Sequence, residues 1–131
     1  MTKENKELLL KDLLGRVLYG VKVDYHGNIF TLGYNLYLNK GDVAFENYPM
    51  LYSLDGIESV KPYLRPMSSM TEEERLIYEQ RLHDVGRSID VIDADDVVSH
   101  MDWLLERHFD FRGLIPMGLA LEAPEDMYKN I

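Results

Sequence analysis

Residues 17–38 read VLYGVKVDYHGNIFTLGYNLYL, and apolar or aromatic side chains recur at every second position on both sides of a central His26–Gly27 pair. A period of two places alternate side chains on opposite faces of an extended chain, so this stretch predicts β-strands. Two residues such as His26 and Gly27 suffice for a tight hairpin turn. We therefore expect an antiparallel hairpin with residues 17–25 and 30–38 as its arms.

The flanking sequence extends this hairpin. Turn residues at 39–41 and apolar residues up to position 54 predict an antiparallel meander of three to four strands over residues 17–54. Leucines at helical spacing between residues 4 and 14 predict an N-terminal helix. Gly15 is placed to end that helix, because glycine takes the left-handed conformation without penalty.

The second half of the chain predicts two helices. Pro62 and Pro66 each remove a backbone donor, so residues 61–69 are expected to form an extended connector. Helices are expected at 71–85 and 95–108. Thr71 followed by Glu74 has the spacing of a capping box at the start of the first. The second has one apolar stripe, formed by Val97, Val98, Met101, Leu104, Leu105 and His108. We expect both to pack on one face of the sheet, and the 131 residues to form a single α+β domain.

The negative charge of the chain is concentrated in one segment. The formal net charge is −9, and residues 71–110, with twelve acids and four bases, account for −8 of it. Such a field repels nucleic-acid phosphates, which disfavours direct nucleic-acid binding and favours a basic protein as partner. A solvated helix face that only improves solubility is the alternative interpretation.

The residue types present restrict the environment and the chemistry. No apolar run approaches the roughly 18 to 20 residues that cross a bilayer, the N-terminus lacks a signal-peptide core, and there is no cysteine. These features predict a cytoplasmic protein without a membrane span or disulfide. Phosphate-binding, dinucleotide-binding and nucleophile-elbow motifs are also missing, so the sequence indicates no catalytic residue, metal ligand or cofactor.

One ridge of the last predicted helix is a candidate binding surface. Its members follow one another at i, i+4, i+7 and i+11, away from the apolar stripe: Asp96, His100, Trp103 and Arg107. Tryptophan and arginine are enriched in interface hot spots, which favours a role in binding. The alternative is that a second element, such as the tail after Phe111, covers the ridge and makes Trp103 an ordinary core residue.

Three stretches carry a family resemblance: KPYLRPMSSMTEEE (61–74), DWLLERHFDFRGLIPMGLALEAPEDMY (102–128) and LLLKDLLGRVLYGVKV (8–23). They resemble a family of small uncharacterised proteins from gut Bacteroidales genomes, prophages and mobile elements. The resemblance covers 57 of the 131 residues. It implies a phage or mobile-element setting in the bacterial cytoplasm, and it carries over no catalytic or binding residue.

These observations together predict a non-enzymatic protein that binds another macromolecule through its acidic helical half. Two alternatives remain open. One is an enzyme whose site is assembled from scattered acids and histidines, which a concave pocket with convergent polar groups would favour. The other is an acidic DNA mimic that inhibits a host nucleic-acid-binding protein, which a duplex-like track of carboxylates would favour.

Overall fold

The computed structural model describes residues 1–33, 38–40, 43–44, 57–87 and 94–128. The elements, in chain order, are α1 (Lys3–Arg16), β1 (Lys22–Tyr25), β2 (Asn28–Leu32), β3 (Leu38–Lys40), β4 (Val43–Ala44), β5 (Val60–Leu64), α2 (Glu72–Arg87), α3 (Ala94–Glu106) and β6 (Leu121–Glu122). An N-terminal helix, a sheet and two later helices confirm the predicted α+β class.

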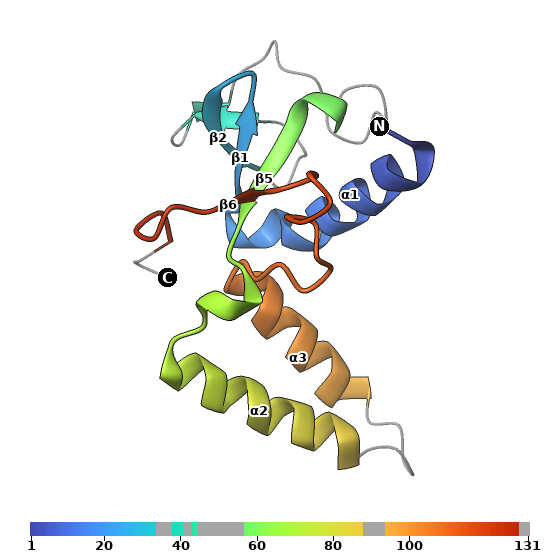
Figure 1. Ribbon diagram of the computed structural model, residues 1–131, viewed down its shortest axis with the longest axis vertical. Coiled ribbons are helices and arrows are strands. Elements are labelled where there is room, and N and C mark those ends of the chain that lie inside the picture. The colour runs from blue at the N-terminus through green and yellow to red at the C-terminus, as the bar shows by residue number, and fades with distance from the viewer. Residues whose placement is uncertain (34–37, 41–42, 45–56, 88–93, 129–131) are drawn as a thin grey trace.

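Among the described residues, the strands form one sheet in the order β4-β3-β2-β1-β5-β6. The first four strands form an antiparallel meander, as predicted. The arm predicted over residues 30–38 is not a single strand, however, because β2 ends at Leu32 and Leu38 begins β3, which pairs antiparallel with β2. β5 returns antiparallel beside β1, and β6 then adds parallel to β5 (Figure 1). The strand material predicted at residues 45–54 lies outside the described residues.

The turn between β1 and β2 has the predicted geometry. His26 and Gly27 have φ angles of 50° and 85°, so both are left-handed. Two successive left-handed residues match the twist of the flanking strands, which is why such turns are favoured in two-residue hairpins. Tyr25 pairs with Asn28 directly across the turn, which confirms the hairpin.

The first helix continues beyond its predicted end. α1 runs through Gly15 to Arg16, and the chain continues as a 3₁₀ turn, Val17–Tyr19, up to Gly20, which has a φ of 67°. The first strand therefore begins at Lys22 and not at residue 17 as predicted, because the 3₁₀ turn and the left-handed Gly20 interrupt the extended chain. Gly15 lies against α3, where a Cβ at this position would make an ordinary van der Waals contact with the Leu105 side chain at 3.4 Å.

β5 is a strand where the sequence predicted an extended connector over residues 61–69. Pro62 pairs with Val23 although it has no backbone donor. Alternate residues of a strand direct their backbone groups to opposite neighbours. The Leu64 carbonyl accepts a hydrogen bond from the backbone beside β6, so the backbone of Pro62, two residues earlier, also faces the β6 side. Pairing with β6 begins only at Tyr63, so no hydrogen bond is lost where Pro62 lacks its N–H group. The ladder therefore tolerates the proline.

The buried side chains form two clusters. The larger joins the sheet, α1 and the segment that precedes β6: Leu9, Leu13, Val21, Val23, Phe30, Leu32, Ile57, Val60, Leu64, Leu114, Leu119 and Ala120. The smaller belongs to the later helices and the chain around them: Trp103, Leu104 and Phe109, with Met67, Met70, Ile77, Tyr78 and Phe111 packed against them. α2 and α3 thus form a helical hairpin with a core of its own.

The position of this hairpin differs from the prediction that both helices pack on one sheet face. α2 and α3 pack on each other and extend away from the sheet, whereas α1 lies beside it (Figure 1). The predicted apolar stripe of α3 is only partly buried as a result. Leu104 and His108 are buried, while Val97 and Val98 are exposed.

Replacing Leu104 by alanine is expected to lower the free energy of unfolding by about 2 to 5 kcal/mol, because truncating a buried leucine loses transfer energy and leaves a cavity. Replacing the exposed Glu106, on the same helix, is expected to cost less than about 0.5 kcal/mol. Urea denaturation of the two variants measures both values. Equal losses would show that the buried and exposed faces of α3 are assigned incorrectly.

Candidate functional site

α2 covers the ridge of α3 that the sequence singled out. Trp103 is 4% exposed, and its ring is stacked on Tyr78 with 6.4 Å between centroids. The His100 ring lies 5.5 Å from the same tyrosine, and Asp96 is half-buried near the start of α3. Trp103 is therefore a core residue, as in the second of the two interpretations, but the covering element is α2 and not only the tail after Phe111.

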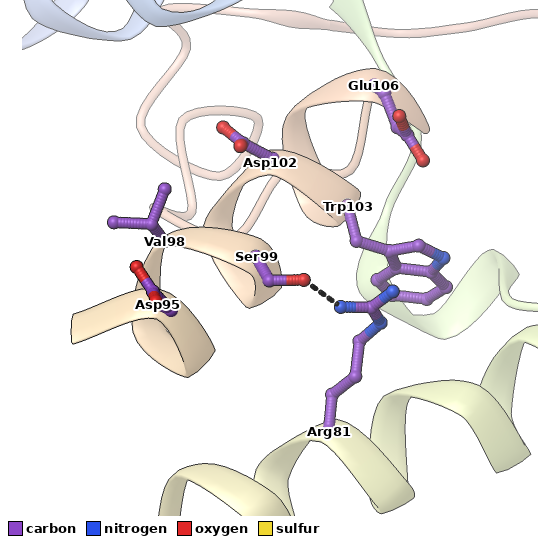
Figure 2. A pocket seen from close by; sticks show the side chains of 7 residues that line it. All are labelled: Arg81, Asp95, Val98, Ser99, Asp102, Trp103 and Glu106. Atoms are coloured by element: carbon purple, nitrogen blue, oxygen red, sulfur yellow. Dashed lines mark hydrogen bonds between the residues drawn. The ribbon is translucent and has the colours of Figure 1, made fainter. Parts of the chain in front are cut away.

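A shallow hollow of about 310 Å³ lies beside Trp103, between α2 and α3. Figure 2 shows Arg81 reaching from α2 to α3, where it donates a 2.8 Å hydrogen bond to the Ser99 hydroxyl. The Arg81 guanidinium lies 5.9 Å from the centre of the Trp103 ring, a cation–π contact. The Asp102 carboxylate points away from Arg81 in Figure 2. This hollow is thus part of the helix–helix contact.

His100 faces the same contact. Burial and the nearby Arg81 lower the pKa of His100. Its Nδ1 atom is buried, and no hydrogen-bond partner for it lies in the part of the chain that the structure describes. His100 and Trp103 therefore join α3 to α2 through their contacts with Tyr78.

A larger hollow than the one beside Trp103 lies where the helical hairpin meets the segment around β6. This cleft has a volume of about 690 Å³. Its apolar lining comes from Pro66, Ile77, Ala123, Pro124 and Tyr128. Its charged lining comes from Arg65, Arg107, Glu73, Glu74, Glu122 and Glu125. Three stretches that are distant in sequence therefore build the cleft: residues 65–77, Arg107 and residues 122–128. Only Arg107 among the lining residues belongs to the ridge predicted from the sequence.

Glu74 organises the floor of the cleft. Its carboxylate accepts two hydrogen bonds from Arg65, of 2.6 and 2.8 Å. It also accepts one from the Thr71 backbone, while the Thr71 hydroxyl accepts from the Glu74 backbone, which is the capping box predicted from the sequence. Burial opposes ionisation, but the hydrogen bonds from Arg65 and Thr71 prevail and lower the pKa of Glu74. Glu74 is thus held as a carboxylate.

Tyr128 forms one wall of the cleft by inserting its hydroxyl between two strands. The hydroxyl accepts a 2.9 Å hydrogen bond from the Lys22 backbone and donates a 2.8 Å bond to the Tyr63 carbonyl. The pairing of β1 with β5 ends at Val23 and Pro62, and the next pair in the same register would be Lys22 and Tyr63. The Tyr128 hydroxyl therefore links the two strands at the point where their direct pairing stops. Burial raises the pKa of Tyr128 to about 12. No sequence motif marks this role.

His108 packs behind that wall. Its ring is stacked on Tyr128 with 3.8 Å between centroids, and its φ of 63° is left-handed. Burial, followed by the charges of Arg16, Arg65 and Lys22, lowers the pKa of His108 to about 4. The folded protein therefore keeps His108 neutral, whereas the unfolded chain binds a proton below pH 6.5, the ordinary value.

The free energy of unfolding is consequently expected to fall as the pH drops from 6.5 towards 4. When only the unfolded chain binds this proton, the free energy of unfolding falls by at most about 1.4 kcal/mol for each pH unit. Above pH 6.5 both states keep His108 neutral, so His108 then makes no contribution to the pH dependence of stability. Asparagine tolerates the left-handed backbone, so His108→Asn is the matched variant. Denaturation midpoints across this pH range should fall less steeply for the variant. Equal slopes would assign the pH dependence to other groups.

A second polar cluster, in which Asp12 and Arg16 are fully buried, joins α1 to the C-terminal part of the chain. Arg16 donates to Asp12 through Nε at 2.7 Å and to the Phe109 carbonyl through Nη2 at 2.7 Å. Asp12 also accepts a 2.5 Å hydrogen bond from Arg112. Asp110 accepts from the backbone of two later residues and orders the turn there. This cluster lines neither of the two hollows described above, so we assign it to the fold.

No protein-family model, curated protein or solved structure matches this chain.

None of the helices in the described ranges is long and apolar enough to cross a bilayer. Across the same ranges, no three histidine, cysteine or acidic side chains come together as a metal site. Asp95 and Asp96 lie in the first turn of α3, where their carboxylates are stabilised by the positive end of the helix dipole.

Proposed function

We propose that this protein is a non-enzymatic binding module whose cleft takes a basic segment of a partner protein. The observation that carries the proposal is the composition of the cleft, an apolar lining with an acidic rim. Glu73, Glu122 and Glu125 are exposed at the rim, and none of the three has an ion-pair partner among the described residues. A basic side chain would neutralise this rim while apolar neighbours of the same segment cover the lining.

The state of the polar groups in the cleft favours binding over catalysis. The Glu74 carboxylate already accepts hydrogen bonds from Arg65 and Thr71. The Tyr128 hydroxyl is likewise hydrogen-bonded to the backbone of Lys22 and Tyr63. A general acid or base needs a pKa near the working pH and access to substrate. The pKa of Glu74 is lowered and that of Tyr128 is raised to about 12, so neither group suits proton transfer near neutral pH, and we assign both to the stability of the fold.

The charge of the surrounding helices supports the same partner class. α2 and α3 belong to residues 71–110, which carry a formal charge of −8. A field of one sign speeds the encounter with an oppositely charged partner and weakens as salt screens it. The mobile-element setting implied by the family resemblance would place that partner among phage or host proteins.

The proposal predicts binding of a labelled, end-blocked peptide that alternates arginine and leucine, measured by fluorescence anisotropy. Changing both Glu122 and Glu125 to glutamine should weaken binding about tenfold. The matched control removes two exposed charges from α1, at Glu4 and Glu7, and should change affinity less than about twofold. Equal losses in both double variants, or equal binding of a peptide with glutamate in place of arginine, would contradict the proposal.

A further inference from the structure

The guanidinium of Arg107 carries a positive charge at the cleft, and Glu74 on the floor of the cleft neutralises this charge only in part. Its nearest carboxylate oxygen, on Glu74, is 3.8 Å away, beyond hydrogen-bond distance. Arg65 already binds both oxygens of that carboxylate. The Arg107 side chain is 35% exposed, and within the described part of the chain its guanidinium donates no hydrogen bond. Its planar set of donors is therefore available to a ligand.

The backbone around Arg107 fixes the position of this guanidinium. Its carbonyl accepts a 3.5 Å hydrogen bond from Arg65, and its amide donates to the Trp103 carbonyl. The start of the side chain is thus held at the end of α3, beside the cleft. A cation on an anchored backbone loses less freedom on binding than one on a mobile loop.

Resting on the proposed function, we infer that the bound segment carries an acidic side chain for Arg107 as well as a basic side chain for the rim. Arg65, Glu74 and Arg107 together leave one positive charge at the floor, whereas Glu73, Glu122 and Glu125 place three negative charges at the rim. A purely basic segment would bury Arg107 without a counter-ion, which is costly. A purely acidic segment would be repelled by the rim.

The occupant is therefore a mixed-charge segment with apolar residues. Its carboxylate forms a paired contact with the Arg107 guanidinium, a geometry that arginine provides and lysine does not. Its basic side chain lies against Glu122 or Glu125. Such a pattern also fixes the direction in which the segment lies, because exchanging its two charges would place like charges together.

The test uses end-blocked peptides of leucine and alanine that carry one arginine and one glutamate at increasing separation, with arginine-only and glutamate-only peptides for comparison. A mixed-charge peptide should bind more tightly than either comparison peptide. Arg107→Gln should weaken the best mixed peptide about tenfold. The same change should raise the affinity for the arginine-only peptide, because that peptide offers Arg107 no carboxylate. Arg107→Lys should give an intermediate affinity, because it keeps the charge and loses the paired contact.

Two outcomes distinguish this inference from the proposed function. If Arg107→Gln leaves the affinity for every mixed peptide unchanged or raises it, the inference is wrong, and the proposed function stands as long as arginine-only binding still depends on Glu122 and Glu125. If no arginine-containing peptide binds, both are wrong. Circular dichroism melting of both Arg107 variants confirms that the fold persists, which is expected because Arg65 still pairs with Glu74.

Discussion

Replacing Asp12 by asparagine is expected to lower the free energy of unfolding by about 3 to 5 kcal/mol, because it removes one partner of a buried ion pair. Asp12 and Arg16 are both fully buried, and Arg16 Nη1 already has no partner among the described residues. The variant would leave the Arg16 charge without a carboxylate inside the protein, and Arg112 would lose its partner as well.

Urea denaturation measures this loss, and two further variants test its cause. Glu7→Gln, an exposed change on the same helix, should cost less than about 0.5 kcal/mol. The double change Asp12→Leu with Arg16→Met removes both charges, so it should be more stable than Asp12→Asn alone, as replacing whole buried ion pairs often is. A loss below about 1 kcal/mol for Asp12→Asn would show that water reaches this pair.

Replacing Trp103 by alanine is expected to cost about 3 to 5 kcal/mol of stability, because the side chain fills the contact between α2 and α3. Its ring lies 5.7 Å from Phe109 and 6.4 Å from Tyr78, so three aromatic rings lose packing together. Trp103→Phe keeps much of the volume and should cost less.

Fluorescence supplies an independent measurement, since Trp103 is the single tryptophan of the chain. Its emission in the native protein should resist quenching by acrylamide and become accessible in urea. Ready quenching of the native protein, together with an unchanged denaturation midpoint in Trp103→Ala, would instead identify an exposed binding residue of the hot-spot kind.

The sequence predicted the elements that depend on local patterns. The two-residue turn at His26 and Gly27 and the capping box at Thr71 and Glu74 are both present. Local rules failed where tertiary contacts prevail. Pro62 suggested a connector, but the direction of its missing donor depends on where β6 lies, which no local pattern states.

The candidate site was predictable only in part for a similar reason. Helical spacing separated Trp103 and Arg107 from the apolar stripe, but the phase of one helix does not identify the element that covers it. Arg65 and Tyr128 reach the cleft from segments that meet only after the chain has folded. A charge count indicated the acidic half of the molecule without locating the cleft within it.

The hydroxyl of Tyr128 also determines when the sheet can be completed during synthesis. It bridges Lys22 and Tyr63, and 106 positions separate it from Lys22 along the chain. On the ribosome, β1 and β5 can pair as soon as both have emerged, but the end where they diverge stays open until residue 128 follows. Contacts between such distant residues form late because loop closure precedes them. The wall of the cleft is therefore assembled after translation of almost every residue described, and any binding that depends on it begins only then.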